Sequence, residues 1–164
     1  MMQLRIAGTV ENSIVDGEGI RYTIFVQGCP HGCPGCHNPQ THDFQGGKLI
    51  DAAVLLKEIA SDPLLDGVTF SGGEPFCQAA ALGKQVHDLG LNLVTYTGYT
   101  LEQLLADGRE DWMALLNETD ILIDGRFEAD KKSYECRFRG STNQRYLDAK
   151  ASVAAGKAVA AALE

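Results

Sequence analysis

Short apolar runs recur along this chain, and most of them end in a turn that carries Gly or Thr. The runs are rich in β-branched and aromatic side chains, and they occupy residues 20–26, 68–70, 91–96 and 121–123. Continuous apolar runs of this length, bounded by turn residues, are typical of strands buried on both faces. The pattern therefore predicts a set of buried parallel strands.

Between these runs, apolar residues recur at helical spacing. Residues 51–60 and 77–89 each place their apolar side chains on one helical face, which predicts two amphipathic connecting helices. Thr100 and Gln103 form a capping-box pair ahead of a leucine-rich stretch. The tail from Asp148 is rich in alanine, so a helix is expected there too.

Strands that alternate with helices indicate an α/β fold with right-handed crossovers, and ligands in such folds bind at the carboxyl ends of the strands. A complete (β/α)8 barrel takes about 250 residues, whereas this chain has 164. We expect a partial (β/α) barrel of about five or six units. The whole chain, 1–164, is expected to form one domain with a C-terminal helical tail over about 148–164.

Composition narrows the class of protein. The net charge is -8 and the 14 Lys and Arg residues are scattered, so a nucleic-acid partner is not expected. The chain has no export-type N-terminus and no apolar run of about 18 residues, so no membrane association is expected. The five cysteines are odd in number and do not suggest a disulfide framework. These features predict a cytoplasmic enzyme.

Three of the cysteines, Cys29, Cys33 and Cys36, lie within eight residues, in a loop of glycines and prolines. Thiolates hold iron–sulfur clusters, normally four of them per cluster. Three close cysteines with no evident fourth would leave one iron open to a small molecule. Glycines in the same loop allow turns whose amide groups can face the cluster sulfides.

A structural zinc site is the alternative interpretation of the same loop. His31, His37 and His42 lie close enough in sequence to complete a Cys3His set. Zinc modules usually divide their ligands into two separated pairs, whereas all three thiols here come from one loop. The spacing favours iron–sulfur but leaves zinc open.

The cysteine spacing followed by His37-Asn38 resembles the signature of radical S-adenosylmethionine enzymes, and most closely that of their glycyl-radical activating branch. Further resemblances run from residue 16 to residue 145. They are Asp-Gly-x-Gly-x-Arg at 16–21, Gly-Gly-Glu-Pro at 72–75, Thr-Gly-Tyr at 97–99, Asp-Gly-Arg-Phe at 124–127 and Arg-Gly-Ser-Thr-Asn-Gln-Arg at 139–145. The last two are similar to motifs of the members that activate the anaerobic ribonucleoside-triphosphate reductase. We expect all these motifs at the carboxyl ends of the strands.

The resemblance implies a [4Fe-4S] cluster on Cys29, Cys33 and Cys36, with S-adenosylmethionine bound beside it. Gly35, Cys36 and His37 would contact the adenosyl part. The Gly-Gly-Glu-Pro loop, through Gly72, Gly73 and Glu74, would hold the methionyl ammonium. Asp124 and Arg126 are expected to point to one side after a strand and to belong to the cofactor-binding residues. The resemblance suggests that Arg126 neutralises the methionine carboxylate. Cys77 and Cys136 are each expected to be a buried or inert thiol.

The activity implied by the resemblance is reductive cleavage of S-adenosylmethionine to a 5′-deoxyadenosyl radical, which takes a hydrogen atom from a glycine of a large glycyl-radical reductase subunit. A flavodoxin or ferredoxin type donor would supply the electron. We expect the glycine loop of the partner to complete the open barrel. Another glycyl-radical activase, or an enzyme like 7-carboxy-7-deazaguanine synthase, remains an alternative within the same superfamily.

Overall fold

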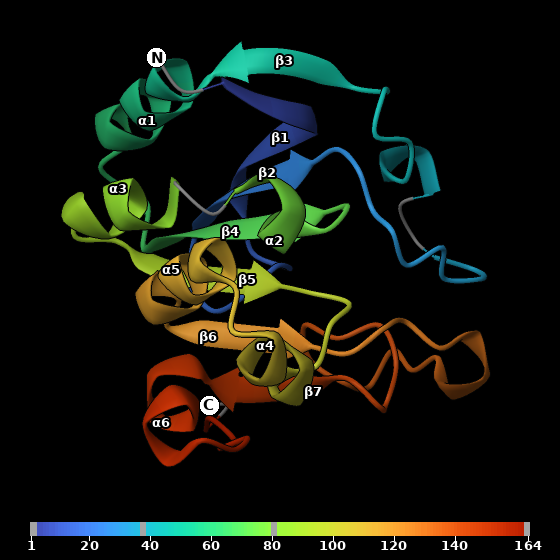
Figure 1. Cartoon of the computed structure of the whole chain (residues 1–164). Coiled ribbons are helices and arrows are strands. Elements are labelled where there is room, and N and C mark those ends of the chain that lie inside the picture. Colours follow the sequence, from blue (N-terminus) through green and yellow to red (C-terminus); the bar gives the residue numbers. More distant parts are fainter. Residues whose placement is uncertain (1–2, 37–38, 80–81, 163–164) are drawn as a thin grey trace.

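The computed structural model describes residues 3–36, 39–79 and 82–162, and these form an α/β fold around one seven-stranded sheet with the order β3-β1-β2-β4-β5-β6-β7 (Figure 1). The strands are β1 (Gln3–Ser13), β2 (Arg21–Val26), β3 (Lys48–Asp51), β4 (Gly67–Gly72), β5 (Asn92–Tyr96), β6 (Ile121–Asp124) and β7 (Arg145–Asp148). The helices are α1 (Ala52–Ser61), α2 (Pro75–Gln78), α3 (Leu82–Asp88), α4 (Leu101–Asp107), α5 (Glu110–Glu118) and α6 (Ala149–Ala155).

The centre of the sheet confirms the four predicted strands, because β2, β4, β5 and β6 pair in parallel. The outer strands β1, β3 and β7 pair antiparallel with their neighbours, and the sequence pattern did not identify them. They carry weaker signals because only part of each strand is buried: β1, for example, buries Leu4 and Ile6 but exposes most of its second half.

Helix α1 begins at the predicted position, where the Asp51 carboxylate accepts a hydrogen bond from the Ala53 amide. Thr100 and Gln103 form both bonds of the predicted capping box at α4. The single helix predicted over 77–89 was wrong: α2 ends at Gln78, and α3 is a separate helix. Residues 80–81, which fall inside that prediction, lie outside the described residues.

Of the alanine-rich tail, the structure describes residues 148–162, and within these only α6 is an α-helix. Gly156 ends this helix in the left-handed conformation, with φ of 70°. The chain then returns to β7, where the Asp148 amide donates to Val159 O and Leu147 forms a bridge with Ala160. Alanine favours a helix at every position, but the glycine cap and the pairing with β7 determine where this one ends.

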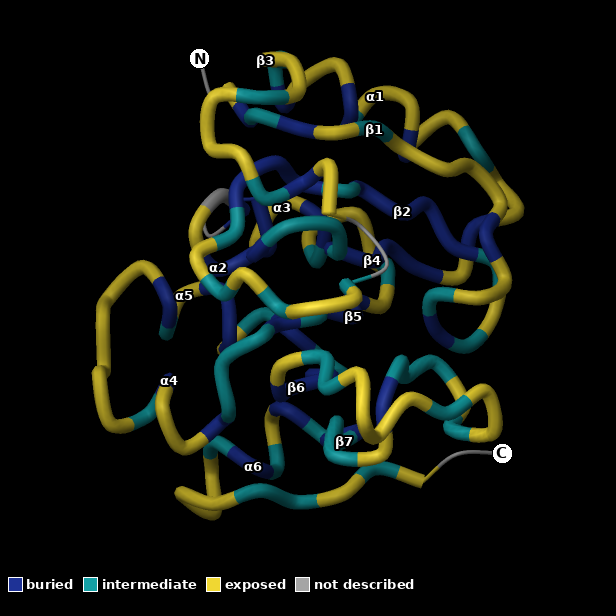
Figure 2. Tube along the Cα trace, turned by 90° about the vertical axis from the view of Figure 1, so that its right-hand side faces the viewer, coloured by how far each residue is buried: buried dark blue, intermediate teal, exposed yellow. Residues whose placement is uncertain are grey.

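The core lies between the central strands and the helices. Figure 2 shows that the buried segments concentrate in the strands, while connecting loops and outer helix sides are exposed. Val68, Phe70, Leu93 and Leu122 have no exposed surface. The loops that follow β2 and β6 extend from the edge where the parallel strands end, on the right of Figure 1. The core thus holds these loops next to each other.

One motif lies at the opposite end of the sheet. Arg21 is the first residue of β2 and pairs with Gly67, the first residue of β4, so the expectation that every motif lies at a carboxyl end was wrong for it. Its guanidinium is buried and donates to Thr69 Oγ1 at 2.8 Å and to Val68 O at 2.9 Å. Burial lowers its pKa. A side chain this long can anchor the base of the sheet, which spacing alone does not reveal.

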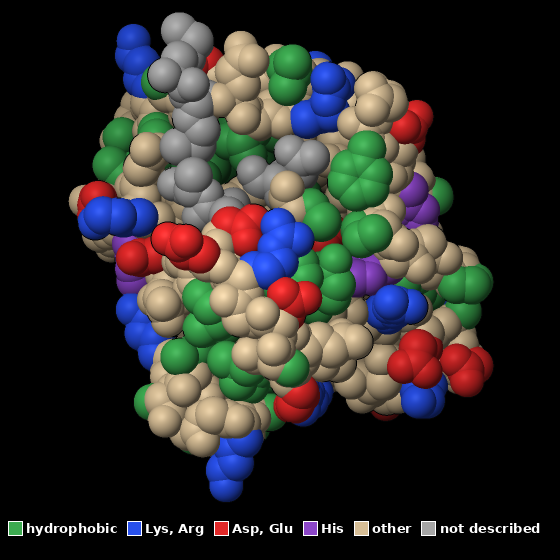
Figure 3. Space-filling model, in the orientation of Figure 1, with side chains coloured by type: hydrophobic (Ala, Val, Ile, Leu, Met, Phe, Trp, Pro, Cys, Tyr) green, Lys and Arg blue, Asp and Glu red, His purple; other side chains and the backbone are tan. Residues whose placement is uncertain are grey.

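The surface carries mixed charge. On the face seen in Figure 3, Lys and Arg side chains are dispersed among Asp and Glu and do not gather into one basic area. Within the ranges that the structure describes, no helix has both the length and the apolar character needed to span a bilayer.

Candidate active site

A cavity of about 770 Å³ opens at the carboxyl ends of the parallel strands. All three predicted cysteines line it, together with Gly72 and Gly73. Thr97, Gly98 and Gly125, from the ends of the next two strands, form another part of its wall. This volume suits a small molecule of cofactor size. Folding therefore brings the cysteine loop and the ends of three strands around one space.

The cysteine loop is held by the segment that follows it. The Gly28 amide donates to Thr41 O at 2.7 Å, and the Cys29 amide donates to His42 O at 3.1 Å. Gly32 and Gly35 adopt φ of 60° and 73°, which allows the turns that a residue with a Cβ would resist. These bonds and turns fix the loop at the cavity wall.

Burial disfavours the charged form of two of the thiols. It raises the pKa of Cys29 to about 11 and also raises the pKa of Cys33. Because thiolates are the metal-binding form, loading of a metal centre here must release protons. Among the residues that the structure describes, no three His, Cys, Asp or Glu side chains are arranged to hold a single metal ion.

Glu74 follows β4 and caps helix α2, with its carboxylate fully buried. Phe76 N donates to Oε2 at 3.1 Å, Gly98 N donates to Oε1 at 2.8 Å, and the Thr97 hydroxyl lies 2.9 Å from both oxygens. The preceding Gly73 is packed so closely that a Cβ there would lie 2.4 Å from Gly28 O. Only glycine fits at that contact.

His31 separates Glu74 from the cavity. Its Nε2 lies 2.6 Å from Glu74 Oε1, and its ring packs edge-on against Tyr99 with 4.6 Å between the centroids. His31 lines the cavity while Glu74 does not. A Cβ on Gly98 would come within 2.4 Å of the imidazole. The sequence pointed to His31 only as an alternative zinc ligand.

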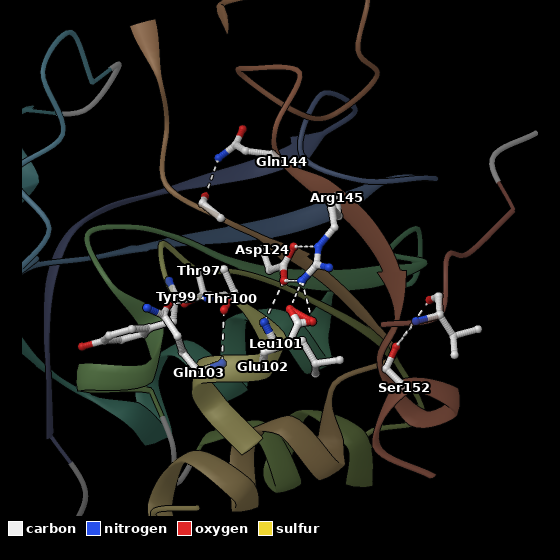
Figure 4. A network of polar contacts seen from close by, with 12 residues as sticks. Thr97, Tyr99, Thr100, Leu101, Glu102, Gln103, Asp124, Gln144, Arg145 and Ser152 are labelled. Atoms are coloured by element: carbon white, nitrogen blue, oxygen red, sulfur yellow. Dashed lines mark hydrogen bonds and ion pairs between the residues drawn. The ribbon is translucent and has the colours of Figure 1, made fainter. Parts of the chain in front are cut away.

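Asp124, at the end of β6, is held by an ion pair inside the protein (Figure 4). Arg145 donates to both of its oxygens, at 2.9 Å and 2.5 Å, and the Leu101 amide donates at 2.7 Å. Arg145 also pairs with Glu102. The Asp124 side chain is 1% exposed and is not among the cavity-lining residues, so the geometry gives it a role in joining β6, β7 and α4.

Arg126 lies beside the cysteine loop in a smaller cavity of about 320 Å³, which Cys33 and Phe127 also line. Its side chain is exposed, and its charge acts to lower the pKa of Cys33 against the larger effect of burial. Gly35 is close to Phe127 and Ala129. His37 lies outside the described residues. Of the other two cysteines, Cys77 is exposed, and Cys136 is partly buried.

Sequence reasoning missed Thr97, Gly98 and Arg145 as partners of the two buried carboxylates. Thr97 and Gly98 belong to a recognised motif, but that motif did not indicate that its hydroxyl and amide point at Glu74. Arg145 was part of another motif without an assigned role. The sequence spacing does not connect these residues with Glu74 or Asp124, because each partner lies 21 to 24 residues away from its carboxylate.

Comparison with known proteins gives matches over most of the chain. Residues 15–147 match the family described as "4Fe-4S single cluster domain". The anaerobic ribonucleoside-triphosphate reductase-activating protein of Pasteurella multocida is 37% identical over 142 residues, which are 80% of this chain and 89% of the relative. Its counterpart from Escherichia coli strain K12 is 32% identical, with 80% and 90% covered.

Two further matches cover a smaller share of the other protein, and one of them also has a lower sequence identity. The pyruvate formate-lyase-activating enzyme of Clostridium pasteurianum is 34% identical over 145 residues, which cover 83% of this chain and 58% of that enzyme. The crystal structure of QueE from Escherichia coli has a TM-score of 0.51 and 20% identity, covering 60% of this chain and 53% of that one. This last likeness concerns the fold.

The matched region includes the cysteine loop, the strand-end cavity and the late motifs, and similarity to the reductase-activating proteins extends over nearly their whole length. This chain therefore belongs to the 4Fe-4S single cluster domain family and to the family of the anaerobic ribonucleoside-triphosphate reductase-activating proteins.

Proposed function

We propose that this chain is an activating enzyme that cleaves S-adenosylmethionine reductively at a [4Fe-4S] cluster and leaves a glycyl radical on the large subunit of the anaerobic ribonucleoside-triphosphate reductase. The observation that supports this most directly is the shared cavity: three thiols from one loop face the carboxyl ends of three neighbouring strands. Ligands of open α/β sheets bind at such ends.

Cys29, Cys33 and Cys36 are the proposed cluster ligands. They fit the group chemically, because they are thiols on one turn-rich loop and they line a cavity large enough for a cluster and a bound nucleotide. When bound, a reduced cluster with one open iron supplies the electron that breaks a carbon–sulfur bond of the sulfonium. The chain itself binds, orients and shields the reactants from water.

The methionyl end of the substrate is proposed to lie against the Gly72–Gly73 backbone, with its ammonium near Glu74. That carboxylate is fully buried behind His31, so the imidazole must move aside for a direct contact. Arg126 is the proposed partner of the methionine carboxylate, because its guanidinium is exposed next to Cys33. Asp124 would act by positioning the turn that carries Arg126.

The adenosyl part is proposed to contact Gly35, Cys36 and His37, as the family resemblance implies. The four parallel strands and their connecting helices are consistent with a partial barrel of the radical S-adenosylmethionine type, formed by a single domain. An open side in such a barrel would admit the glycine loop of the reductase. A cytoplasmic location and a flavodoxin or ferredoxin type electron donor complete the proposal.

The test is anaerobic reconstitution of the full chain with iron and sulfide. Wild-type protein should turn brown with about four irons per chain, and alanine at Cys29, Cys33 or Cys36 should abolish the colour. Alanine at Cys77 or Cys136 provides matched controls that keep the cluster. A colourless wild-type protein that retains one zinc would falsify the proposal.

The partner is tested separately, by oxygen-free release of 5′-deoxyadenosine with and without the reductase, followed by electron paramagnetic resonance. A glycyl doublet that depends on the reductase is expected. The match to a pyruvate formate-lyase-activating enzyme favours a second candidate partner, pyruvate formate-lyase, which should be assayed in parallel. A doublet on that enzyme alone would replace the reductase as the target.

A further inference from the structure

No chemical role could be assigned to the late motif at 139–145 from the sequence. The structure connects this motif with the turn that follows β6. The Asn143 side-chain Nδ2 donates to Arg126 O at 2.8 Å. The Gln144 side-chain Nε2 donates to Gly125 O at 3.0 Å, while its Oε1 accepts from the Gly140 amide at 2.8 Å. Two consecutive side-chain amides thus hold two consecutive carbonyl groups of the turn.

The turn itself lies against the cysteine loop. Phe127 lines both the large and the small cavity, and its ring lies close to the position that a Cβ on Gly35 would occupy. The main chain of Phe127 forms a hydrogen bond with the Cys33 thiol. Burial raises the pKa of that thiol, and the bond to Phe127 opposes this rise by favouring the thiolate, as an amide N–H that donates to sulfur does. Arg126 places a positive charge beside the same sulfur.

Asn143 is held in an orientation that leaves its side-chain oxygen without a hydrogen bond among the described residues. Its Oδ1 is buried, and no hydrogen-bond partner for it is found among the described residues. A buried acceptor without a partner costs free energy. The amide could not be turned over to relieve this, because Arg126 O requires a donor. The bond to the turn is therefore kept although the other half of the amide is unpaired.

We propose that Asn143 and Gln144 are positioning residues that raise the reduction potential of the cluster by fixing the turn 125–127 against Cys33. This inference rests on the proposed function, since it requires a cluster on Cys33. Reduction adds one electron, so the reduced cluster is the more negative form. An N–H bond to a ligand sulfur and a nearby guanidinium both favour that form. If the turn moves away, both contributions weaken and reduction becomes harder.

The experiment is a redox titration of the reconstituted full chain without S-adenosylmethionine, followed by the electron paramagnetic resonance signal of the reduced cluster. Asn143→Ala and Gln144→Met each remove an amide donor without adding charge. At a fixed solution potential, we expect each variant to lower the ratio of reduced to oxidised cluster by about tenfold. This corresponds to a reduction potential about 59 mV lower for a one-electron couple. Thr142→Ala changes an exposed neighbour in the same loop and should leave the potential unchanged.

Phe127 provides a direct test of the N–H donor. Phe127→Pro removes the amide hydrogen and should lower the potential at least as much, whereas Phe127→Leu keeps the amide and should retain the wild-type value. Equal potentials in wild type, Asn143→Ala and Gln144→Met would overturn the inference while leaving the proposed function intact. A wild-type protein that binds no cluster would instead remove the proposed function itself.

A second measurement covers variants that load iron poorly. Hydrogen exchange at the Phe127 amide, measured on the cluster-free full chain, should be faster in Asn143→Ala than in wild type or Thr142→Ala, because the turn is no longer fixed. Unchanged protection in Asn143→Ala would overturn the inference without any cluster being present.

Discussion

Glu74 and Asp124 form an instructive pair, because they share position and burial but differ in the charge that faces them. Glu74 follows β4 and Asp124 ends β6, and both hold the segment after β5, which lies between them in the sheet. Asp124 is paired with the guanidinium of Arg145. Glu74 meets two backbone amides, a hydroxyl and an imidazole.

This difference explains why two residues with similar sequence contexts have different roles. A buried carboxylate that already has a guanidinium partner has its charge compensated. A buried carboxylate that has dipolar donors and an imidazole keeps the capacity to attract a cation such as an ammonium group. The hydrogen bonds from Arg145 to Asp124 and Glu102 raise the pKa of Arg145. The bond from Arg145 also lowers the pKa of Glu102. Asp124 therefore joins β6, β7 and α4, whereas Glu74 is the carboxylate that fits the proposed contact with the substrate ammonium.

The largest expected effect separates the two carboxylates by substrate affinity. Glu74→Gln keeps the shape but removes the charge, and the loss of a charge-assisted contact should weaken S-adenosylmethionine binding by about 30-fold, or about 2 kcal/mol. Asp124→Asn should change that affinity by less than about threefold. Equilibrium dialysis with the reconstituted protein measures both. Similar losses in the two variants would contradict the division of roles.

The next effect concerns the free energy of unfolding, and here Asp124 is the carboxylate whose replacement should matter. Asp124→Asn leaves Arg145 without its buried partner, and we expect the free energy of unfolding to fall by about 2 kcal/mol, a value reduced because Arg145 is 38% exposed. Urea unfolding of the cluster-free chain measures this. Asp124→Asn combined with Arg145→Met should recover part of the loss, since no charge is then left unpaired. Additive losses in the double variant would argue against a coupled pair.

A smaller change tests the position of His31 over Glu74. In Gly98→Ala the new methyl group would lie 2.4 Å from the imidazole, so the ring must leave the carboxylate. We expect a loss of about 1 to 2 kcal/mol in the free energy of unfolding. Nuclear magnetic resonance of the His31 ring should show the displacement. An unshifted ring in a stable variant would mean that the backbone moves instead. Gly8→Ala, at a glycine with open space around it and without a left-handed φ, is the comparison for steric effects.

The smallest effect uses a carboxylate outside the cavity as a reference. The buried Tyr22 hydroxyl donates to Glu58 at 2.6 Å, and burial together with that bond raises the Tyr22 pKa to about 12. Its contribution to stability should be complete below pH 10, the unfolded value, and should fall as the pH rises toward 12. Tyr22→Phe should cost about 1 kcal/mol at neutral pH and remove this alkaline loss. Thermal melting across pH 8 to 12 measures it; an unchanged profile would contradict the assignment.

Local sequence predicted the features that depend on local chemistry. The central parallel strands appeared as continuous apolar runs because both of their faces are buried. The Thr100 capping box was predicted because the cap and the Gln103 amide lie three residues apart. The antiparallel edge strand β7 was missed because its four residues are too few for a clear period, and its place depends on pairing with β6.

The sequence by itself determined the α/β class, the family, and the loop that brings Cys29, Cys33 and Cys36 together, because each of these follows from residues that are neighbours in the chain. Only the tertiary structure decided which of two buried carboxylates is neutralised, that His31 covers Glu74, and that Asn143 and Gln144 hold the turn beside Cys33. These outcomes depend on groups that are distant in sequence and meet through strand order, and an electrostatic environment exists only once those groups are assembled.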